Sequence, residues 1–220
     1  MSDATQTLEQ TLNKTDLGHL IYEKRKIFFI FLFFVLIGAT GFLLWKQNLK
    51  SIALENSLSV FQFQSDVWTK VKEEKKSVDE LVTSFTALDE GVKLSPAMVP
   101  VLLEMGKFLY DKGNYLEADK LLSQVEGKIK HPVSDSFVTM QRVVVLEKLG
   151  KINEAISLLE PLAQKSESIM PAKVSLDLAR LYIAKGEKGK AQTQLEYITN
   201  TFPNDEYAKL AKLYLQSLAK

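Results

Sequence analysis

The sequence contains no cysteine, and other residues that build catalytic or metal sites are scarce in it. Without thiols the chain forms no disulfide, no cysteine nucleophile and no zinc finger of the usual kind. Of its two histidines, His19 and His131, only the second lies in the C-terminal part, which excludes a metal site built on a histidine pair there. The patterns GxxxxGK[ST], GxSxG and HExxH are also missing. We therefore predict a protein that is not an enzyme and uses no cofactor or metal.

Neither sign of charge predominates, because 28 Lys and Arg residues stand against 27 Asp and Glu residues. A nucleic-acid-binding surface usually shows a basic surplus, so we expect no nucleic-acid partner, and no motif indicates a small-molecule substrate. Several acids fall along one predicted helical hairpin, and we interpret them as a solvated face rather than an acid/base pair. These acids are Glu104, Asp111, Glu117, Asp119 and Glu126.

An apolar run occupies residues 27–45, IFFIFLFFVLIGATGFLLW, with no charge and no proline. A helix of that length spans roughly 28 Å, close to the hydrocarbon thickness of a bilayer. A cleaved signal peptide is the alternative, with Ala39 and Gly41 as small residues near a cut. However, a long segment precedes the run and apolar residues continue past Gly41, which favours an uncleaved transmembrane helix.

Cations flank both ends of this run, with Lys24, Arg25 and Lys26 before it and Lys46 and Lys50 after it. The excess on the N-terminal side predicts that this side faces the cytoplasm. The chain would then have a cytoplasmic tail at 1–26 and a C-terminal part on the far side of the membrane. The two sides differ by only one cation, so the reversed topology remains an alternative.

The region 46–95 predicts a helical stalk and a first helical pair. No glycine or proline occurs from Lys46 to Lys75, and apolar residues recur there at helical spacing. That spacing leaves open whether Val67 or Trp68 faces the domain. A second helix is expected from Val78 to Gly91.

Residues 96–220 predict helical hairpin repeats, because a Gly-to-Ala pattern occurs three times, at 113–118, 150–155 and 186–191. The alanines are 37 and then 36 residues apart. Glycine suits the turn between two helices, and alanine suits the point where they approach closely. Apolar residues four and seven positions after each alanine would fill the seam: Leu122 and Val125, Leu159 and Leu162, Leu195 and Ile198.

This pattern resembles the tetratricopeptide repeat, with the family's first-helix glycine at Gly106 and its closing proline at Pro203. The chain departs from the family in its longer spacing, in lacking the signature tryptophan, and in having Val143 and Ala179 at the later glycine positions. Pro161 falls inside a second helix, which it should kink or shorten. A helical bundle with accidental spacing is the alternative.

The fold class predicted is therefore all-α: an N-terminal transmembrane helix followed by tetratricopeptide-like hairpins in a short α-solenoid. A C-terminal capping helix is expected from Asp205 to Ala219, because five apolar residues share one of its faces. These are Tyr207, Leu210, Ala211, Tyr214 and Leu218.

The resemblance also implies a partner-binding groove, lined by the first helix of each hairpin, that would suit an extended apolar peptide. Its residues would be Leu103, Lys107, Tyr110, Phe137, Met140, Val144, Glu147, Leu176, Arg180 and Ile183. In a short array the stalk or the capping helix would be able to fill the same groove, and these residues would then be core.

The layout of anchor, stalk, repeats and cap resembles the ancillary subunit of the Sec translocon, a single-span protein of the bacterial inner membrane. That resemblance implies a periplasmic domain and protein partners: the SecYEG channel, a periplasmic chaperone and secreted chains. Two alternatives remain, a scaffold for envelope assembly or division and a cytosol-facing import receptor with reversed topology.

Overall fold

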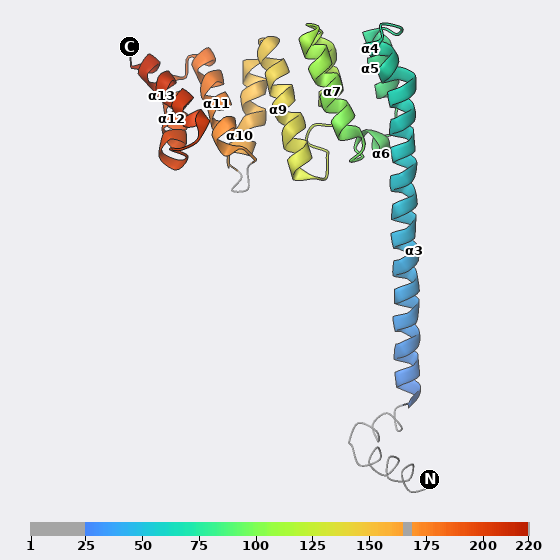
Figure 1. Ribbon diagram of the computed structural model, residues 1–220. Coiled ribbons are helices and arrows are strands. Elements are labelled where there is room, and N and C mark those ends of the chain that lie inside the picture. Colours follow the sequence, from blue (N-terminus) through green and yellow to red (C-terminus); the bar gives the residue numbers. More distant parts are fainter. Residues whose placement is uncertain (1–24, 165–168, 220) are drawn as a thin grey trace, which may run out of the picture. The chain divides into compact units, whose positions relative to one another are not determined.

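The computed structural model describes residues 25–164 and 169–219, and every regular element in those ranges is a helix (Figure 1). The predicted all-α fold is therefore confirmed. The predicted tail, 1–26, lies outside the described residues except for Arg25 and Lys26, which begin the first helix. The elements are α3 (Arg25–Phe63), the π-helix η1 (Gln64–Trp68), α4 (Thr69–Lys72), α5 (Val78–Thr86), α6 (Glu90–Lys93), α7 (Met98–Asp111), α8 (Tyr115–Ser123), α9 (Pro132–Lys148), α10 (Ile152–Gln164), α11 (Pro171–Lys185), α12 (Lys188–Thr201) and α13 (Glu206–Leu218).

The chain divides into two compact units after Leu54, and helix α3 supplies the described part of the first. This helix is long and apolar enough to cross a membrane: its most apolar stretch of 18 residues has a mean hydropathy of 2.1, and none of that stretch is buried in the protein. A hydrocarbon environment leaves no water to satisfy polar groups. In keeping with this, the Thr40 hydroxyl donates to the carbonyl of Leu36 at 2.9 Å, inside its own helix.

The second unit begins with the last turns of α3, which continue into η1 and α4. A π-helix inserts one extra residue per turn and so shifts the phase of the side chains that follow. Val67 and Trp68, at the end of this π-helix, are both buried in the core. Trp68 is completely buried and stacks edge-on against Phe108, with ring centroids 5.1 Å apart.

The single helix expected from Val78 to Gly91 is wrong, because the structure has two short helices, α5 and α6, instead. Helix α5 starts with a capping box in which Ser77 and Glu80 exchange hydrogen bonds of 2.8 and 3.1 Å. It ends at Thr86, whose carbonyl accepts a 2.8 Å hydrogen bond from the Lys93 amine. That side chain satisfies a helix-terminal carbonyl and so stabilises the early end.

Three hairpins follow in a row, α7–α8, α9–α10 and α11–α12 (Figure 1). Their turns have the same backbone geometry. Each turn glycine has a left-handed backbone, with φ of 80° at Gly113, 71° at Gly150 and 85° at Gly186. The residue after each glycine donates its N–H to the carbonyl five positions earlier, at 2.8, 2.9 and 2.8 Å. These bonds form the Schellman motif, which explains the demand for glycine at each turn.

The hairpin alanines lie where the sequence predicts close approach, since Ala118, Ala155 and Ala191 are all completely buried. All six seam residues that follow them are buried too. The core forms two clusters that meet in α9, where Val145 belongs to the first and Leu146 to the second. Helix α9 is therefore buried on two faces, as expected of a middle element in stacked hairpins.

Replacing Ala155 with leucine is expected to lower the free energy of unfolding by about 1–3 kcal/mol, because the larger side chain overpacks the α9–α10 seam. The melting temperature of the detergent-solubilised protein measures the effect. Ser157→Leu is the matched control, because Ser157 is exposed on the same helix and tolerates added volume. Equal melting temperatures for the two variants would contradict the close approach at Ala155.

Two expectations about individual residues are corrected by the structure. Of the kink or shortening expected at Pro161, an end of the helix at this residue is wrong, because α10 continues to Gln164. Proline removes one donor from the ladder, and here its exposed ring needs no space in the core. Leu210 does not share the buried face of α13, because 43% of it is exposed. No described helix covers Leu210, although Ala211 beside it is completely buried.

Candidate functional site

The predicted groove residues come from equivalent positions of α7, α9 and α11. They lie ten, six and three residues before the turn glycine of their hairpin, and Phe137 lies three residues before the first of these positions in α9. We call this set the first-helix surface. It comprises Leu103, Lys107 and Tyr110 on α7; Phe137, Met140, Val144 and Glu147 on α9; and Leu176, Arg180 and Ile183 on α11.

The exposure of these side chains depends on their row. In the row ten residues before the glycine, Met140 and Leu176 are buried in the second core cluster and Leu103 packs partly against the first. Lys107 and Phe137 are exposed. The remaining members of the first-helix surface are half-buried: Tyr110, Val144, Glu147, Arg180 and Ile183. The residues ten positions before the glycine therefore belong mainly to the core, whereas those six and three positions before it reach solvent.

Helices α7 and α9 approach closely at Gly106. A Cβ atom there would lie 2.9 Å from the side-chain nitrogen of Gln141, so a larger residue would displace that amide. The Gln141 amide nitrogen donates a 2.8 Å hydrogen bond to the backbone carbonyl of Leu103. The first-helix glycine of the repeat thus admits a polar contact between successive first helices. No sequence pattern indicated a role for Gln141.

Helices α9 and α11 are joined by an ion pair within the first-helix surface. Arg180 Nη2 lies 2.7 Å from Glu147 Oε1, and Arg180 Nη1 lies 3.1 Å from Asp177 Oδ1. Burial would lower the pKa of Arg180, but the Glu147 and Asp177 carboxylates outweigh it and raise that pKa above its ordinary value. The Arg180 cation is thus charged and already paired, so it adds little net charge to the first-helix surface.

The first-helix surface also has aromatic side chains, Tyr110 on α7 and Phe137 on α9. The rings of Tyr110 and Tyr115 stack edge-on at 5.3 Å, and the Lys148 amine lies 6.0 Å from the Tyr110 ring centroid. Phe137, with 39% exposed, presents its ring to solvent at the start of α9. Such a surface can hold apolar side chains of a bound segment while its polar groups meet the backbone.

The solvated-face interpretation of the acids is wrong for Asp119, which is buried. Its Oδ1 accepts from Arg142 Nε at 2.8 Å and its Oδ2 from the Lys151 amine at 2.9 Å. Arg142 Nη1 also lies 3.0 Å from Glu126 Oε2. Burial would raise the pKa of Asp119, but the hydrogen bonds from Lys151 and Arg142 outweigh it and lower that pKa. Every member is paired, so this cluster joins α8 to α9 rather than performing proton transfer.

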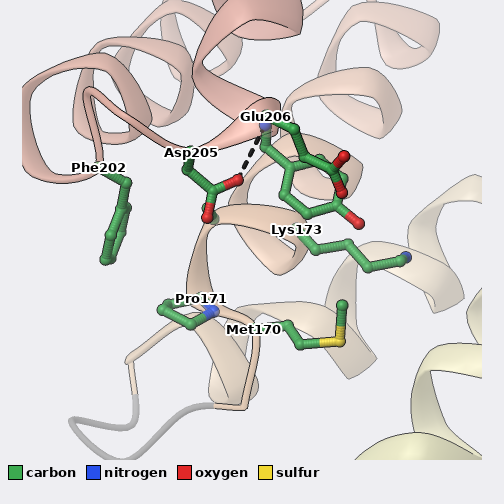
Figure 2. Close-up of a pocket in the computed structure, with 8 residues that line it drawn as sticks. Met170, Pro171, Lys173, Phe202, Asp205 and Glu206 are labelled. Carbon is green, nitrogen blue, oxygen red and sulfur yellow. Dashed lines mark hydrogen bonds between the residues drawn. The ribbon is translucent and has the colours of Figure 1, made fainter.

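A cleft of about 410 Å³ opens between the start of α11 and the start of α13 (Figure 2). Met170, Pro171 and Phe202 line it, together with Asp205, whose carboxylate accepts a 2.9 Å hydrogen bond from the backbone N–H of Tyr207. A second cavity of about 240 Å³ lies among residues of α4, α5 and α7. Sequence reasoning predicted neither. Among the described residues no group of three or more His, Cys, Asp or Glu side chains is placed to hold a metal ion.

Comparison with known proteins gives a family match over part of the chain. No curated protein and no solved structure is significantly similar to the chain. Residues 146–213, from the end of α9 into α13, match the family described as tetratricopeptide repeat, whose members typically serve as non-catalytic modules for protein interaction. With the three hairpins and their shared turn geometry, this match supports a tetratricopeptide domain with protein partners in a chain that also has a helix long enough to span a membrane.

Proposed function

We propose that the chain is a membrane-anchored interaction protein whose first-helix surface binds an extended protein segment. The observation that supports this proposal most directly is the repetition of half-exposed side chains at the same register on α7, α9 and α11. A regular series of equivalent positions matches the regular spacing of residues along an extended peptide. The ion pair of Arg180 with Glu147 keeps the surface near neutral, which favours an apolar segment.

We further propose that the repeat domain lies in the periplasm of a bacterium and works beside the Sec translocon. There it would dock a periplasmic chaperone at the SecYEG channel or assist secreted chains as they emerge. The proposal rests on the layout, in which an apolar helix α3 precedes a short array of tetratricopeptide hairpins. A weakly structured, apolar secreted chain has the chemistry that the first-helix surface accommodates.

Photocrosslinking in intact cells tests the binding surface. A photoreactive residue at Phe137 is expected to form adducts with protein partners, because this side chain is exposed on α9. The same residue at Leu116 is the matched control, since Leu116 is 57% exposed on the second helix α8. Many adducts that disappear when protein synthesis stops would support secreted chains as ligands. A single persistent adduct would support a scaffold, and equal adducts from both positions would overturn the assignment of the surface.

Reporter fusions at the two ends of the chain test the topology separately. We expect the N-terminal reporter to be active in the cytoplasm and the C-terminal reporter to be active outside it, because the flanking cations favour that orientation. A cytoplasmic C-terminus would contradict the Sec proposal and would favour an import receptor. It would leave the crosslinking result unaffected, so the two tests fail independently.

A further inference from the structure

Helix α13 has the residue pattern of the first helix of another hairpin. Its Leu210, Ala211 and Tyr214 have the spacing of Leu178, Ala179 and Tyr182 on α11. It packs against α12 as α11 packs against α10. Ala211, like its counterpart, is completely buried. The family match, which extends to residue 213, also includes most of this helix.

The two helices differ in what covers them. On α11 the side chains of Leu178 and Leu181 are each 1% exposed, and α12 packs along this helix as the second member of its hairpin. The equivalent residues on α13 are Leu210 and Leu213, which are 43% and 61% exposed. The apolar face that a second helix would cover is therefore open.

The charges beside this face indicate what would cover it. Lys209 and Lys212 are exposed on α13 and outnumber its one carboxylate, Glu206, which is exposed near the start of the helix. Within the described part of the chain neither lysine lies in an ion pair. If a second copy of the chain paired with α13 in antiparallel two-fold symmetry, the lysine-bearing edges would lie along the same side and repel. A helix with carboxylates on one flank would instead neutralise both lysines.

We propose that α13 binds an amphipathic, acidic helix of a partner protein, which takes the place of the second helix of a fourth hairpin. The three complete hairpins define the apolar pattern of such a helix. Each second helix has a small residue followed by large apolar residues four and seven positions later, as in Ala191, Leu195 and Ile198. The ligand of this site is thus distinct from the extended segment proposed for the first-helix surface.

The test titrates the full-length protein in detergent with a labelled synthetic helix that has Ala, Leu and Ile at this spacing and glutamates along one flank. A second peptide has lysines in place of the glutamates. We expect the acidic peptide to bind at least about tenfold more tightly than the basic one. Leu213→Asp is expected to lower the affinity for the acidic peptide by about tenfold or more, since it places a charge in the apolar face.

Two further variants make the result specific. The double variant Lys209→Glu with Lys212→Glu is expected to reverse the preference, so that the basic peptide binds better. Leu116→Asp is the matched control, because Leu116 is also exposed but lies on α8. Equal binding of the two peptides, no binding, or equal losses from Leu213→Asp and Leu116→Asp would overturn the proposal. So would a dimer in light scattering that Leu213→Asp dissociates, because it would identify a second copy as the occupant.

Discussion

Replacing Trp68 with alanine is expected to lower the free energy of unfolding of the helical domain by about 3–5 kcal/mol. The indole is completely buried and packs edge-on against Phe108, so its removal leaves a cavity that the surrounding helices fill only in part. The substitution also deletes the 3.1 Å hydrogen bond from Nε1 to Glu104 Oε2. Urea denaturation of the detergent-solubilised protein, followed by circular dichroism, measures the loss.

Two variants separate the sources of this effect. Trp68→Phe retains most of the buried ring but not the hydrogen bond. It is expected to lower the free energy of unfolding by about 1–2 kcal/mol. Glu104 keeps its 2.9 Å ion pair with Lys72 in that variant, so the carboxylate stays charged and paired. Trp45→Ala is the control for loss of a tryptophan, because Trp45 is 59% exposed on α3. An equal free energy of unfolding for Trp68→Ala and Trp45→Ala would refute the role of Trp68 in the core.

The hairpins were predictable from sequence because their determinants are local. A left-handed turn favours glycine, and the turns at Gly113, Gly150 and Gly186 all have this backbone. Close helix approach requires a small side chain, which is why the alanine spacing identified the hairpin seams. Both requirements act on single positions at fixed separation, so they leave a readable pattern even where the family's tryptophan is missing.

Features that depend on distant partners left no such pattern. The π-helix that buries Val67 and Trp68 together is stabilised by packing against α5 and α7, so apolar spacing alone indicated one residue or the other. The early end of α5 depends on the amine of Lys93, and the burial of Asp119 depends on Arg142. A charged residue predicts solvent exposure unless its partner is known.

In the candidate site, too, local features were predictable from the sequence and features that depend on distant contacts were not. Register relative to the turn glycine identified which residues share the first-helix surface, because the hairpins repeat. It did not separate Met140, which neighbouring helices bury, from Lys107, which remains exposed. That distinction depends on how closely successive hairpins stack, and at Gly106 the stacking depends on a contact with Gln141. Side-chain exposure within a repeat array is therefore a tertiary property.

Replacing Arg142 with alanine is expected to lower the free energy of unfolding by about 2–4 kcal/mol, somewhat less than the loss of a fully buried ion pair. The side chain is 16% exposed and pairs with Asp119 and Glu126, whose side chains are 12% and 18% exposed. Removing the guanidinium leaves Glu126 without its partner and Asp119 with Lys151 alone. Two poorly hydrated carboxylates then oppose folding, and urea denaturation at neutral pH measures their effect.

Arg180→Ala is the matched control, because Arg180 is also an ion-paired arginine on the first helix of a hairpin. Its side chain is 36% exposed, so water screens its pairs with Glu147 and Asp177. We expect a loss of about 1 kcal/mol or less for this variant. If Arg142→Ala and Arg180→Ala destabilised the protein equally, burial would not be the reason for the large effect expected at Arg142.

The same cluster gives stability a dependence on acid pH. The pKa of Asp119 is lowered in the folded state, so the stability that its charge contributes is present above the unfolded-state pKa of about 4 and is lost as pH falls through the lower folded-state pKa. Asp119→Asn removes the titrating group but keeps the side chain's size. We therefore expect the difference in unfolding free energy between the natural protein and this variant to be constant near neutral pH and to shrink below about pH 4. A difference that stays unchanged through this range would show that the charge of Asp119 does not stabilise the junction of α8 and α9.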